Sequence, residues 1–408
     1  MGGRKAKWIG VGLLILFGLI FLSNLYREKE RALWDFRTYY FAARAFQEGQ
    51  SPYTLEALSE AAGAQITLPF LYPPFTLFVF LPFTSLHFWT AFQVYFLIKI
   101  LSVALLFWIW FVFLKRDFDW LFLPFALVAF NSAVPLDVAA GNISSFEQIL
   151  LWSAFLFYIR GRLLPFCALV VFASLFKLTP LFFLLLLFYS EDRKRIYFLV
   201  GSILAFGVIL LSGYLLYPDL MVEFSQQVNQ TLGDHESRGL WNPSTFALIR
   251  DGIYRAMTSL GEKVGTQGAF KLYSILGLGL SLCTFRVLRD SHFRSNVPQA
   301  EKNHYRICLL CLLYVLLVPR LQVYSYLVVI PAAFFFLKRW SGSMVYPLSL
   351  FFLMSLSARD VFFPGMKQFY DFFWDYSPLI VCAALWIMAV TENWRGHPQK
   401  ETPIVGME

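Results

Sequence analysis

A small set of charged residues is best suited to chemistry in this sequence. They are Asp35, Lys177, His235, Arg238 and Arg320. Aromatic and polar residues that could contact a bound molecule accompany them, namely Tyr39, Tyr40, Arg44, Asn142, Trp241, Asn242 and Tyr324. Lysine and arginine bind phosphate strongly, and arginine does so through two parallel hydrogen bonds. The set therefore indicates a site that binds a phosphorylated ligand. The site also contains a carboxylate, that of Asp35.

Each of these residues also has a plain structural interpretation. Asp35 could cap a helix, Gly141-Asn142 could end one, and Arg320 could hold a phospholipid headgroup. Lys177 is harder to explain in this way, because an ammonium group at membrane depth is costly unless it faces a polar cavity or snorkels to the interface. Lys177 therefore favours a functional site most strongly.

The composition identifies the kind of element that must position these side chains. Of 408 residues, 58% are hydrophobic and 15% are charged, whereas a soluble domain has about 25% charged residues. Long stretches lack Asp, Glu, Lys and Arg, and they cover residues 8–26, 70–98, 120–136, 196–218 and 340–358. About 20 apolar residues in a helix cross the hydrocarbon core. The expected fold class is an all-α polytopic membrane protein, which excludes a soluble enzyme, a disordered chain and a coiled coil.

The net charge of +8 does not indicate a nucleic-acid partner, because the basic residues form short clusters between apolar segments. The five cysteines all lie in apolar segments, so we expect them to be buried and to form no disulfide framework. Cys308 and Cys311 form a single CxxC, which is insufficient for a metal site. No metal and no cofactor are expected, since no His/Cys cluster has ligand spacing and no glycine-rich nucleotide loop follows a strand.

Basic clusters mark the cytoplasmic side of a membrane protein. From an uncleaved first helix at 8–25, this rule predicts about 12 membrane helices (roughly 10 to 13) and places both termini in the cytoplasm. A single helix over 163–190 would put one basic cluster outside, so two short helices that meet at Lys177–Pro180 are predicted. Residues 71–86 contain three prolines and are expected to be re-entrant or interfacial.

This topology forms one membrane domain over residues 1–408, with two larger extracytoplasmic loops at 26–70 and 218–270. In the first loop no Gly or Pro interrupts Asp35 to Gln47, so an amphipathic helix along the interface is predicted there. All candidate site residues fall on the extracytoplasmic side, where ATP and nucleotide sugars are absent. A lipid-linked phosphorylated donor fits that side, with its tail in the bilayer and its phosphate on Lys177 and Arg320.

Several short motifs, taken in their order along the chain, resemble glycosyltransferase family 87. They are Asp35 with Tyr39-Tyr40-Phe41-Ala42-Ala43, Gly49 to Tyr53, Tyr72-Pro73-Pro74, Gly141-Asn142, Lys177-Leu178-Thr179-Pro180, Trp241-Asn242-Pro243-Ser244, and Pro319-Arg320 with Tyr324-Ser325-Tyr326. The resemblance covers residues 30–340. The chain departs from the family's pattern at Gly141-Asn142, where Gly-Gln is commoner.

The resemblance implies a GT-C-type membrane enzyme that uses a polyprenyl-phosphate sugar, with Asp35 as the general base of an inverting transfer. The donor phosphate is then expected to bind Lys177, Arg320, Arg238 and His235. Substrate is expected to bind Tyr39, Tyr40, Arg44, Asn142, Trp241, Asn242 and Tyr324. The implied sugar is a hexose, in the first place mannose. The implied acceptor is lipid-linked or a polysaccharide, at the extracytoplasmic face of a bacterial or archaeal plasma membrane.

Two alternatives remain open at this point. An arabinofuranosyltransferase of the same fold would present the same residues. A transporter or flippase of lipid-linked sugars would instead carry charged residues across the bilayer midplane and an inverted repeat, and no internal repeat is found in the sequence. The expected partners are a polyprenyl-phosphate sugar, a glycolipid or glycan acceptor and membrane lipids, with no nucleic acid.

Overall fold

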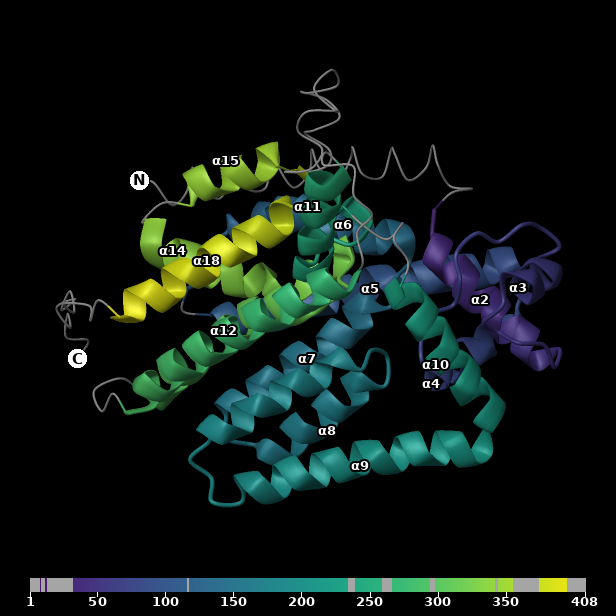
Figure 1. Cartoon of the computed structure of the whole chain (residues 1–408), viewed down its shortest axis with the longest axis horizontal. Coiled ribbons are helices and arrows are strands. Elements are labelled where there is room, and N and C mark those ends of the chain that lie inside the picture. Colours follow the sequence, from purple (N-terminus) through teal and green to yellow (C-terminus); the bar gives the residue numbers. More distant parts are fainter. Residues whose placement is uncertain are drawn as a thin grey trace.

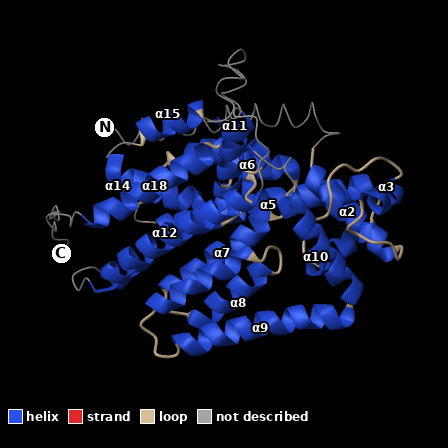
Figure 2. Cartoon of the chain, viewed as in Figure 1, coloured by secondary structure: helices blue, strands red, loops and turns tan. Residues whose placement is uncertain are grey.

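The computed structural model describes residues 32–115, 117–233, 239–258, 266–293, 298–341, 344–354 and 374–394, together with positions 8 and 12. These residues form helices and loops, and none of them lies in a β-strand (Figure 2). The first elements are α2 (Trp34–Gln47), α3 (Leu55–Ala62), α4 (Pro74–Phe80), η1 (Leu81–Ser85), α5 (Phe88–Leu114), α6 (Phe122–Ala140), α7 (Ser144–Ile159), α8 (Leu163–Ser174) and η2 (Thr179–Tyr189). The later elements are α9 (Arg195–Leu216), α10 (Pro218–Gly233), η3 (Gly239–Trp241), α11 (Thr245–Thr258), α12 (Thr266–Phe293), α13 (Gln299–Leu317), η4 (Val323–Val329), α14 (Ile330–Ser341), α15 (Val345–Leu353) and α18 (Ser377–Trp394).

Five helices in the described ranges are long and apolar enough to cross a membrane. They cover Phe88–Leu114, Phe122–Ala140, Arg195–Leu216, Gln267–Asp290 and Val323–Ser341. Shorter apolar helices cover Pro74–Ser85, Leu163–Ser174, Thr179–Tyr189 and Ser377–Thr391. The predicted class, an all-helical membrane protein, is confirmed. The number of crossings, about 12, stays a prediction, and the expected first helix at 8–25 lies outside the described residues except for positions 8 and 12.

The segment 163–190 is broken, as its flanking charges predicted. It forms α8 and η2, and Lys177 lies in the turn between them. Tyr158, at the end of α7, donates a hydrogen bond to the carbonyl of Leu186 in η2 at 2.9 Å, whereas Lys177 contacts Ser144 at the start of α7. The two short helices are therefore antiparallel, and they return the chain to the end of the bundle at which it entered.

The loops with clustered lysine and arginine residues, in the part of the chain that the structure describes, meet at one end of the helix bundle. Lys338 in α14 donates a hydrogen bond to the carbonyl of Asp117 after α5 at 2.6 Å. Arg306 in α13 donates to the last carbonyl of η2 at 3.1 Å, and the ring Nε2 of His304 lies 3.1 Å from the carbonyl oxygen of Phe113 in α5. Clusters that were predicted to share one side of the membrane thus share one end of the bundle.

The opposite end of the bundle contains α2 and the turns with the candidate site residues. Figure 1 shows α2 and α3 there, with α10 rising beside α4. Tyr95 in α5 donates a hydrogen bond to the carbonyl of Gly141 after α6 at 2.8 Å. Ser244, before α11, donates to the carbonyl of Pro319 after α13 at 2.6 Å. These contacts gather residues that are far apart in the sequence.

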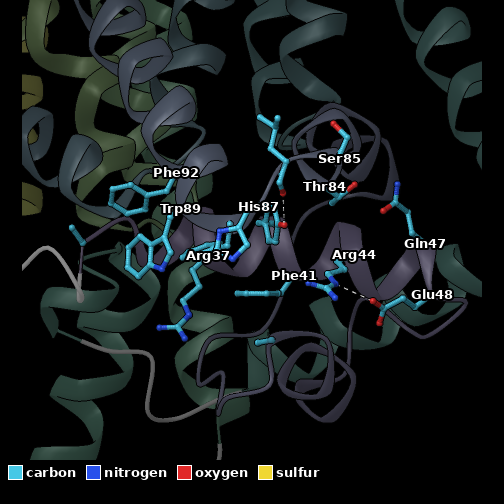
Figure 3. Close-up of a pocket in the computed structure, with 15 residues that line it drawn as sticks. Arg37, Phe41, Arg44, Gln47, Glu48, Thr84, Ser85, His87, Trp89 and Phe92 are labelled. Atoms are coloured by element: carbon cyan, nitrogen blue, oxygen red, sulfur yellow. Dashed lines mark hydrogen bonds and ion pairs between the residues drawn. The ribbon is translucent and has the colours of Figure 1, made fainter.

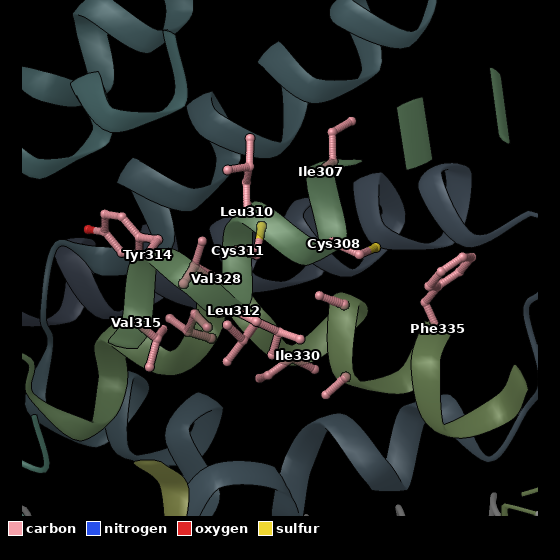
Figure 4. Close-up of a cluster of buried hydrophobic side chains, with 14 of the residues drawn as sticks. Ile307, Cys308, Leu310, Cys311, Leu312, Tyr314, Val315, Val328, Ile330 and Phe335 are labelled. Atoms are coloured by element: carbon pink, nitrogen blue, oxygen red, sulfur yellow. The ribbon is translucent and has the colours of Figure 1, made fainter. Parts of the chain in front are cut away.

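The main apolar core lies between the helices that join these two ends. Figure 4 shows part of it, where Leu310 and Cys311 of α13 pack near Val328 and Ile330. All five cysteines are free, and Cys167, Cys308, Cys311 and Cys382 are buried as predicted. Cys283 is exposed, so the prediction of burial is wrong for this residue. Little of the apolar helix α12 is buried inside the protein, and Cys283 lies on its exposed surface, where lipid can cover an apolar side chain.

Candidate active site

The helix α2 carries Asp35 in its first turn and is fixed by aromatic packing. The ring of Phe36 stacks on that of Tyr95 in α5, with centroids 4.3 Å apart and planes inclined by 13°. The backbone N–H of Leu33 donates to the carbonyl of Ala139 at the end of α6 at 2.7 Å. The helix predicted for this loop is confirmed. Its dipole favours a carboxylate in the first turn.

Asn142 lies at the centre of the candidate site. Its side-chain Nδ2 donates a hydrogen bond to Asp35 Oδ2 at 2.7 Å, and it lies 2.8 Å from Tyr72 Oη and 3.0 Å from Tyr39 Oη. Tyr39 Oη in turn donates to Tyr72 Oη at 2.9 Å. Asn142 is fully buried, whereas Asp35 is partly exposed. Asn142 therefore holds the carboxylate from within, and the residue that carries it keeps some exposed surface.

Ser144 connects this cluster to Lys177. The side-chain Oδ1 of Asn142 accepts hydrogen bonds from the backbone N–H of Ser144 at 2.9 Å and from its hydroxyl at 2.7 Å, which turns the amide nitrogen towards Asp35. Lys177 Nζ donates to Ser144 Oγ at 2.7 Å and lies 3.1 Å from a carboxylate oxygen of Glu147. A continuous chain of hydrogen bonds thus joins a carboxylate to an ammonium group.

The turn after α13 brings Arg320 towards Lys177. Lys177 Nζ lies 5.7 Å from the centroid of the Tyr324 ring, and Arg320 interacts electrostatically with Tyr324. Asn242 supports this turn, because its Oδ1 accepts a hydrogen bond from the backbone N–H of Leu321 at 2.9 Å. Both cations that were predicted to bind the phosphate therefore lie near the same tyrosine.

Tyr40 and Arg44 leave α2 on a different face from Asp35. The hydroxyl of Tyr40 donates to the carbonyl of Leu86 at 2.8 Å. Arg44 Nε lies 2.9 Å from Glu48 Oε1 and forms an ion pair with it. The structure therefore does not bring these two predicted substrate-binding residues into the cluster around Asn142.

The remaining predicted residues belong to the loop between α10 and α11. Trp241 is 63% exposed at the end of η3. His235 and Arg238 lie outside the described residues. Of this loop, the structure therefore places Trp241 and Asn242 at the same end of the bundle as Lys177 and Arg320.

A buried ion pair below the site was not predicted. Lys99 Nζ of α5 lies 2.7 Å from Asp137 Oδ2 of α6, and both side chains are fully buried. Lys99 also donates hydrogen bonds to Ser145 Oγ at 2.7 Å and to the backbone carbonyl of Asn142. The pair therefore holds the turn that presents Asn142. The sequence did carry a signal for this pair, namely a single lysine within a 27-residue apolar helix. A charge inside a membrane span needs a partner.

We expect Gly141→Ala to destabilise the protein and distort the site. Gly141 has φ +64°, and a Cβ atom added there would lie 2.9 Å from Leu33 Cδ2 at the start of α2. Gly161 is the matched control, because it has φ +71° and nothing within 4 Å of an added Cβ. When unfolding is measured in detergent solution, Gly141→Ala should lower the free energy of unfolding by about 1–3 kcal/mol more than Gly161→Ala does. Equal losses would show that the contact with Leu33 is unimportant.

Burial raises the pKa of Asp35 from 3.8 to about 6. The hydrogen bond from Asn142 opposes this rise, as do the charges of Lys177 and Lys99, whereas the nearby charge of Asp137 adds to it. A carboxyl group with this pKa is mostly ionised at neutral pH, yet it binds a proton more tightly than a free aspartate. Such a group is suited to general-base chemistry.

Fold and site together define an integral membrane protein with a partly exposed carboxylate and nearby cations at one end of a helix bundle. A sequence model of glycosyltransferase family 87 matches residues 70–319, which is more than half of the chain. The chain therefore belongs to glycosyltransferase family 87 and is a glycosyltransferase. The match includes Asn142 and Lys177, whereas Asp35 precedes it and Arg320 directly follows it. Comparisons with curated proteins and with solved structures gave no match.

Proposed function

We propose that this glycosyltransferase transfers a hexose from a polyprenyl-phosphate donor to a lipid-linked or polysaccharide acceptor. Mannose is the hexose that we favour. Transfer takes place at the extracytoplasmic membrane face, with inversion at the sugar. Asp35 is the general base, and Lys177 and Arg320 bind the donor phosphate. The observation that supports this proposal most is the hydrogen-bond chain from Asp35 through Asn142 and Ser144 to Lys177.

In the proposed reaction the Asp35 carboxylate takes the proton of the acceptor hydroxyl while that oxygen attacks the anomeric carbon. The glycosidic bond forms on the face opposite to the breaking bond between the anomeric carbon and the phosphate oxygen. The electron pair of the breaking bond stays with the phosphate, so polyprenyl phosphate leaves with one additional negative charge. Lys177 and Arg320 stabilise this charge as it develops, since fixed cations lower the energy of such a transition state.

The ion pair between Lys177 and Glu147 bears on how phosphate binds. The side chain of Lys177 is 21% exposed, whereas that of Glu147 is 3% exposed. Glu147 therefore contacts the ammonium group from inside, and part of the Lys177 side chain remains exposed to a ligand. The pair is neutral as a unit, and Arg320 is therefore proposed as a second cation that binds the phosphate together with Lys177. His235 and Arg238 remain part of the proposal as further phosphate ligands, on the basis of the sequence.

Aromatic and polar residues around this cluster complete the proposed substrate site. Tyr39 and Asn142 border Asp35, where the acceptor hydroxyl must approach. Trp241 exposes most of its ring, and an exposed indole can stack on the apolar face of a sugar. Tyr324 interacts with both Lys177 and Arg320 and is expected to contact the donor.

The proposal is tested by incubating the purified protein with a panel of polyprenyl-phosphate sugars and a lipid extract as acceptor. Released polyprenyl phosphate and new glycolipids are measured by mass spectrometry, with nucleotide sugars as control donors. We expect release from polyprenyl-phosphate mannose and none from nucleotide sugars. Turnover with polyprenyl-phosphate arabinofuranose alone would keep the donor class and change the sugar, and turnover with nucleotide sugars alone would overturn the donor class.

The raised pKa of Asp35 predicts an acid limb in the pH–rate profile. Because the pKa is about 6, kcat/KM should fall about tenfold per pH unit below that value and level off above it. The hydrogen bond from Asn142 lowers this pKa, so Asn142→Ala should move the limb to higher pH. Asn303→Ala, at the basic end of the bundle, is the control and should leave the limb in place. A limb that does not move in Asn142→Ala would contradict the assignment of the base.

A further inference from the structure

A second face of α2 is not used by the proposed transfer site. Arg37, Phe41, Arg44 and Glu48 follow one another at spacings of four, three and four residues, so they share one side of the helix. Asp35 precedes Arg37 by two residues and therefore points about 200° away around the helix axis. The two sides of α2 have different neighbours and can serve different ligands.

This second face borders a pocket between α2 and the start of α5. The pocket has a volume of about 730 Å³, and its lining includes Arg37, Arg44, Ser85, His87, Trp89 and Phe92. Figure 3 shows the rings of Trp89 and Phe92 on one side and the ion pair of Arg44 with Glu48 on the other, with His87 between them. Arg37 lies beside Trp89 (Figure 3), so the pocket combines aromatic rings with charged and polar side chains.

The charged side chains of the lining favour an anion. Two arginines face one acidic residue, Glu48, which pairs with Arg44 at 2.9 Å. The Nε–H group of Arg37 is buried and has no acceptor among the described residues. The two arginines of the lining thus exceed its one carboxylate, and the Nε–H group of Arg37 still lacks an acceptor. Phosphate matches this set, because its oxygens accept parallel hydrogen bonds from a guanidinium group.

An apolar surface continues from the pocket along α5. Leu97, Leu101 and Trp108 lie within about 40° of one another around this helix, and Trp89 lies about 80° from the nearest of them, Leu97. All four are exposed, Trp89 by 50% and Trp108 by 61%. The helix is long and apolar enough to cross a membrane, so hydrocarbon chains cover this surface in a bilayer. A tryptophan at the start of such a helix is typical of the headgroup level. A ligand with a charged head and a long hydrocarbon chain can therefore use the pocket and the α5 surface together.

We propose that this pocket binds the headgroup of an anionic membrane phospholipid, of the phosphatidylglycerol class, with Arg37 as its main phosphate ligand. The acyl chains lie along the exposed surface of α5. The bound lipid connects α2 to α5 from outside, on the side of α2 that Asp35 does not use. This site is separate from the transfer site, and its occupancy does not depend on which sugar or acceptor is used.

The full-length protein in detergent provides a direct test by native mass spectrometry with added phosphatidylglycerol. We expect Arg37→Gln/Arg44→Gln to weaken binding of the tightest lipid at least tenfold. Arg160→Gln/Arg162→Gln removes the same charge from exposed positions at the opposite end and should leave that binding unchanged. Phosphatidylcholine should bind more weakly than phosphatidylglycerol, and glycerol phosphate should not compete at equal concentration, because it lacks the acyl chains.

A photoactivatable phosphatidylglycerol gives a second readout on the unmodified protein. Its cross-links should map to the start of α5 and to the second face of α2. Equal binding by Arg37→Gln/Arg44→Gln, equal binding of phosphatidylcholine, or cross-links elsewhere would overturn the proposal. Preferential capture of polyprenyl phosphate at Arg37 would also overturn it, since the pocket would then belong to the donor.

Discussion

Replacing Asp35 by asparagine should reduce turnover by about 10²- to 10⁴-fold while donor binding persists. Asparagine keeps an oxygen that can accept the 2.7 Å hydrogen bond from Asn142, but it cannot take a proton from the acceptor hydroxyl. The effect should therefore appear in kcat, measured as the initial rate of polyprenyl phosphate release, and much less in the dissociation constant of the donor.

The chain offers a matched control for this substitution. Asp219 lies in the first turn of α10 and is exposed, so Asp219→Asn removes a carboxylate at an equivalent helix position without touching the site. It should retain nearly full turnover. A stably folded Asp35→Asn protein with near-normal turnover would remove Asp35 from the reaction.

Asp35→Asn should also make the protein more stable above about pH 6. The pKa of Asp35 is raised from 3.8 to about 6, so the folded protein binds this proton more tightly and ionisation opposes folding. The loss of stability caused by this ionisation is absent below pH 3.8, grows up to about pH 6 and is complete above it. It amounts to about 3 kcal/mol at most, because Asp35 is partly exposed. Thermal unfolding at pH 7.5 should show a higher midpoint for Asp35→Asn, and the difference should vanish near pH 4.

Lys177→Met should weaken donor binding and lower turnover by about 10²- to 10³-fold. The substitution removes the ammonium group and leaves the buried carboxylate of Glu147 without its partner, 3.1 Å away in the native protein. Two causes therefore need to be separated, namely the loss of a phosphate ligand and the presence of an unpaired acid. The double variant Lys177→Met/Glu147→Gln removes both charges and relieves the second cause.

The double variant distinguishes the two roles of Lys177. If Lys177 only neutralises Glu147, the double variant should regain the turnover of the native protein. We expect it to recover stability but to remain impaired in donor binding. The losses from Lys177→Met and Arg320→Gln should be non-additive by about 0.5–3 kcal/mol, because both side chains hold one phosphate. Strictly additive losses would separate Arg320 from the phosphate site.

The break at Lys177 and the one-sided distribution of the basic loops could be predicted because both follow from helix length and charge. A single helix over 163–190 would be too long for an untilted pass and would leave a basic cluster on the wrong side. The structure solves this with two antiparallel short helices. The grouping of Asp35, Asn142 and Lys177 was suggested by their shared side, and the structure brings them into one hydrogen-bonded cluster.

The partners of these residues could not be predicted, because they depend on which helices are neighbours in space. Glu147 pairs with Lys177 from a different helix, and nothing in the sequence marks that contact. Tyr39 and Tyr40 are adjacent in the sequence, but successive residues of a helix point about 100° apart. Tyr39 therefore joins the cluster around Asn142, whereas Tyr40 bonds to the carbonyl of Leu86 beside the second pocket.

An experimental structure with a bound, non-hydrolysable polyprenyl-phosphate sugar would test the proposed site most directly. The distances to be measured are from the donor phosphate to Lys177 Nζ and from the anomeric carbon to Asp35. We expect the phosphate within about 4 Å of Lys177, as in an ion pair, with the sugar between it and Asp35 and room for an acceptor hydroxyl at the carboxylate. A phosphate bound at Arg37 and Arg44 instead, with the sugar on the side of α2 away from Asp35, would contradict the proposal.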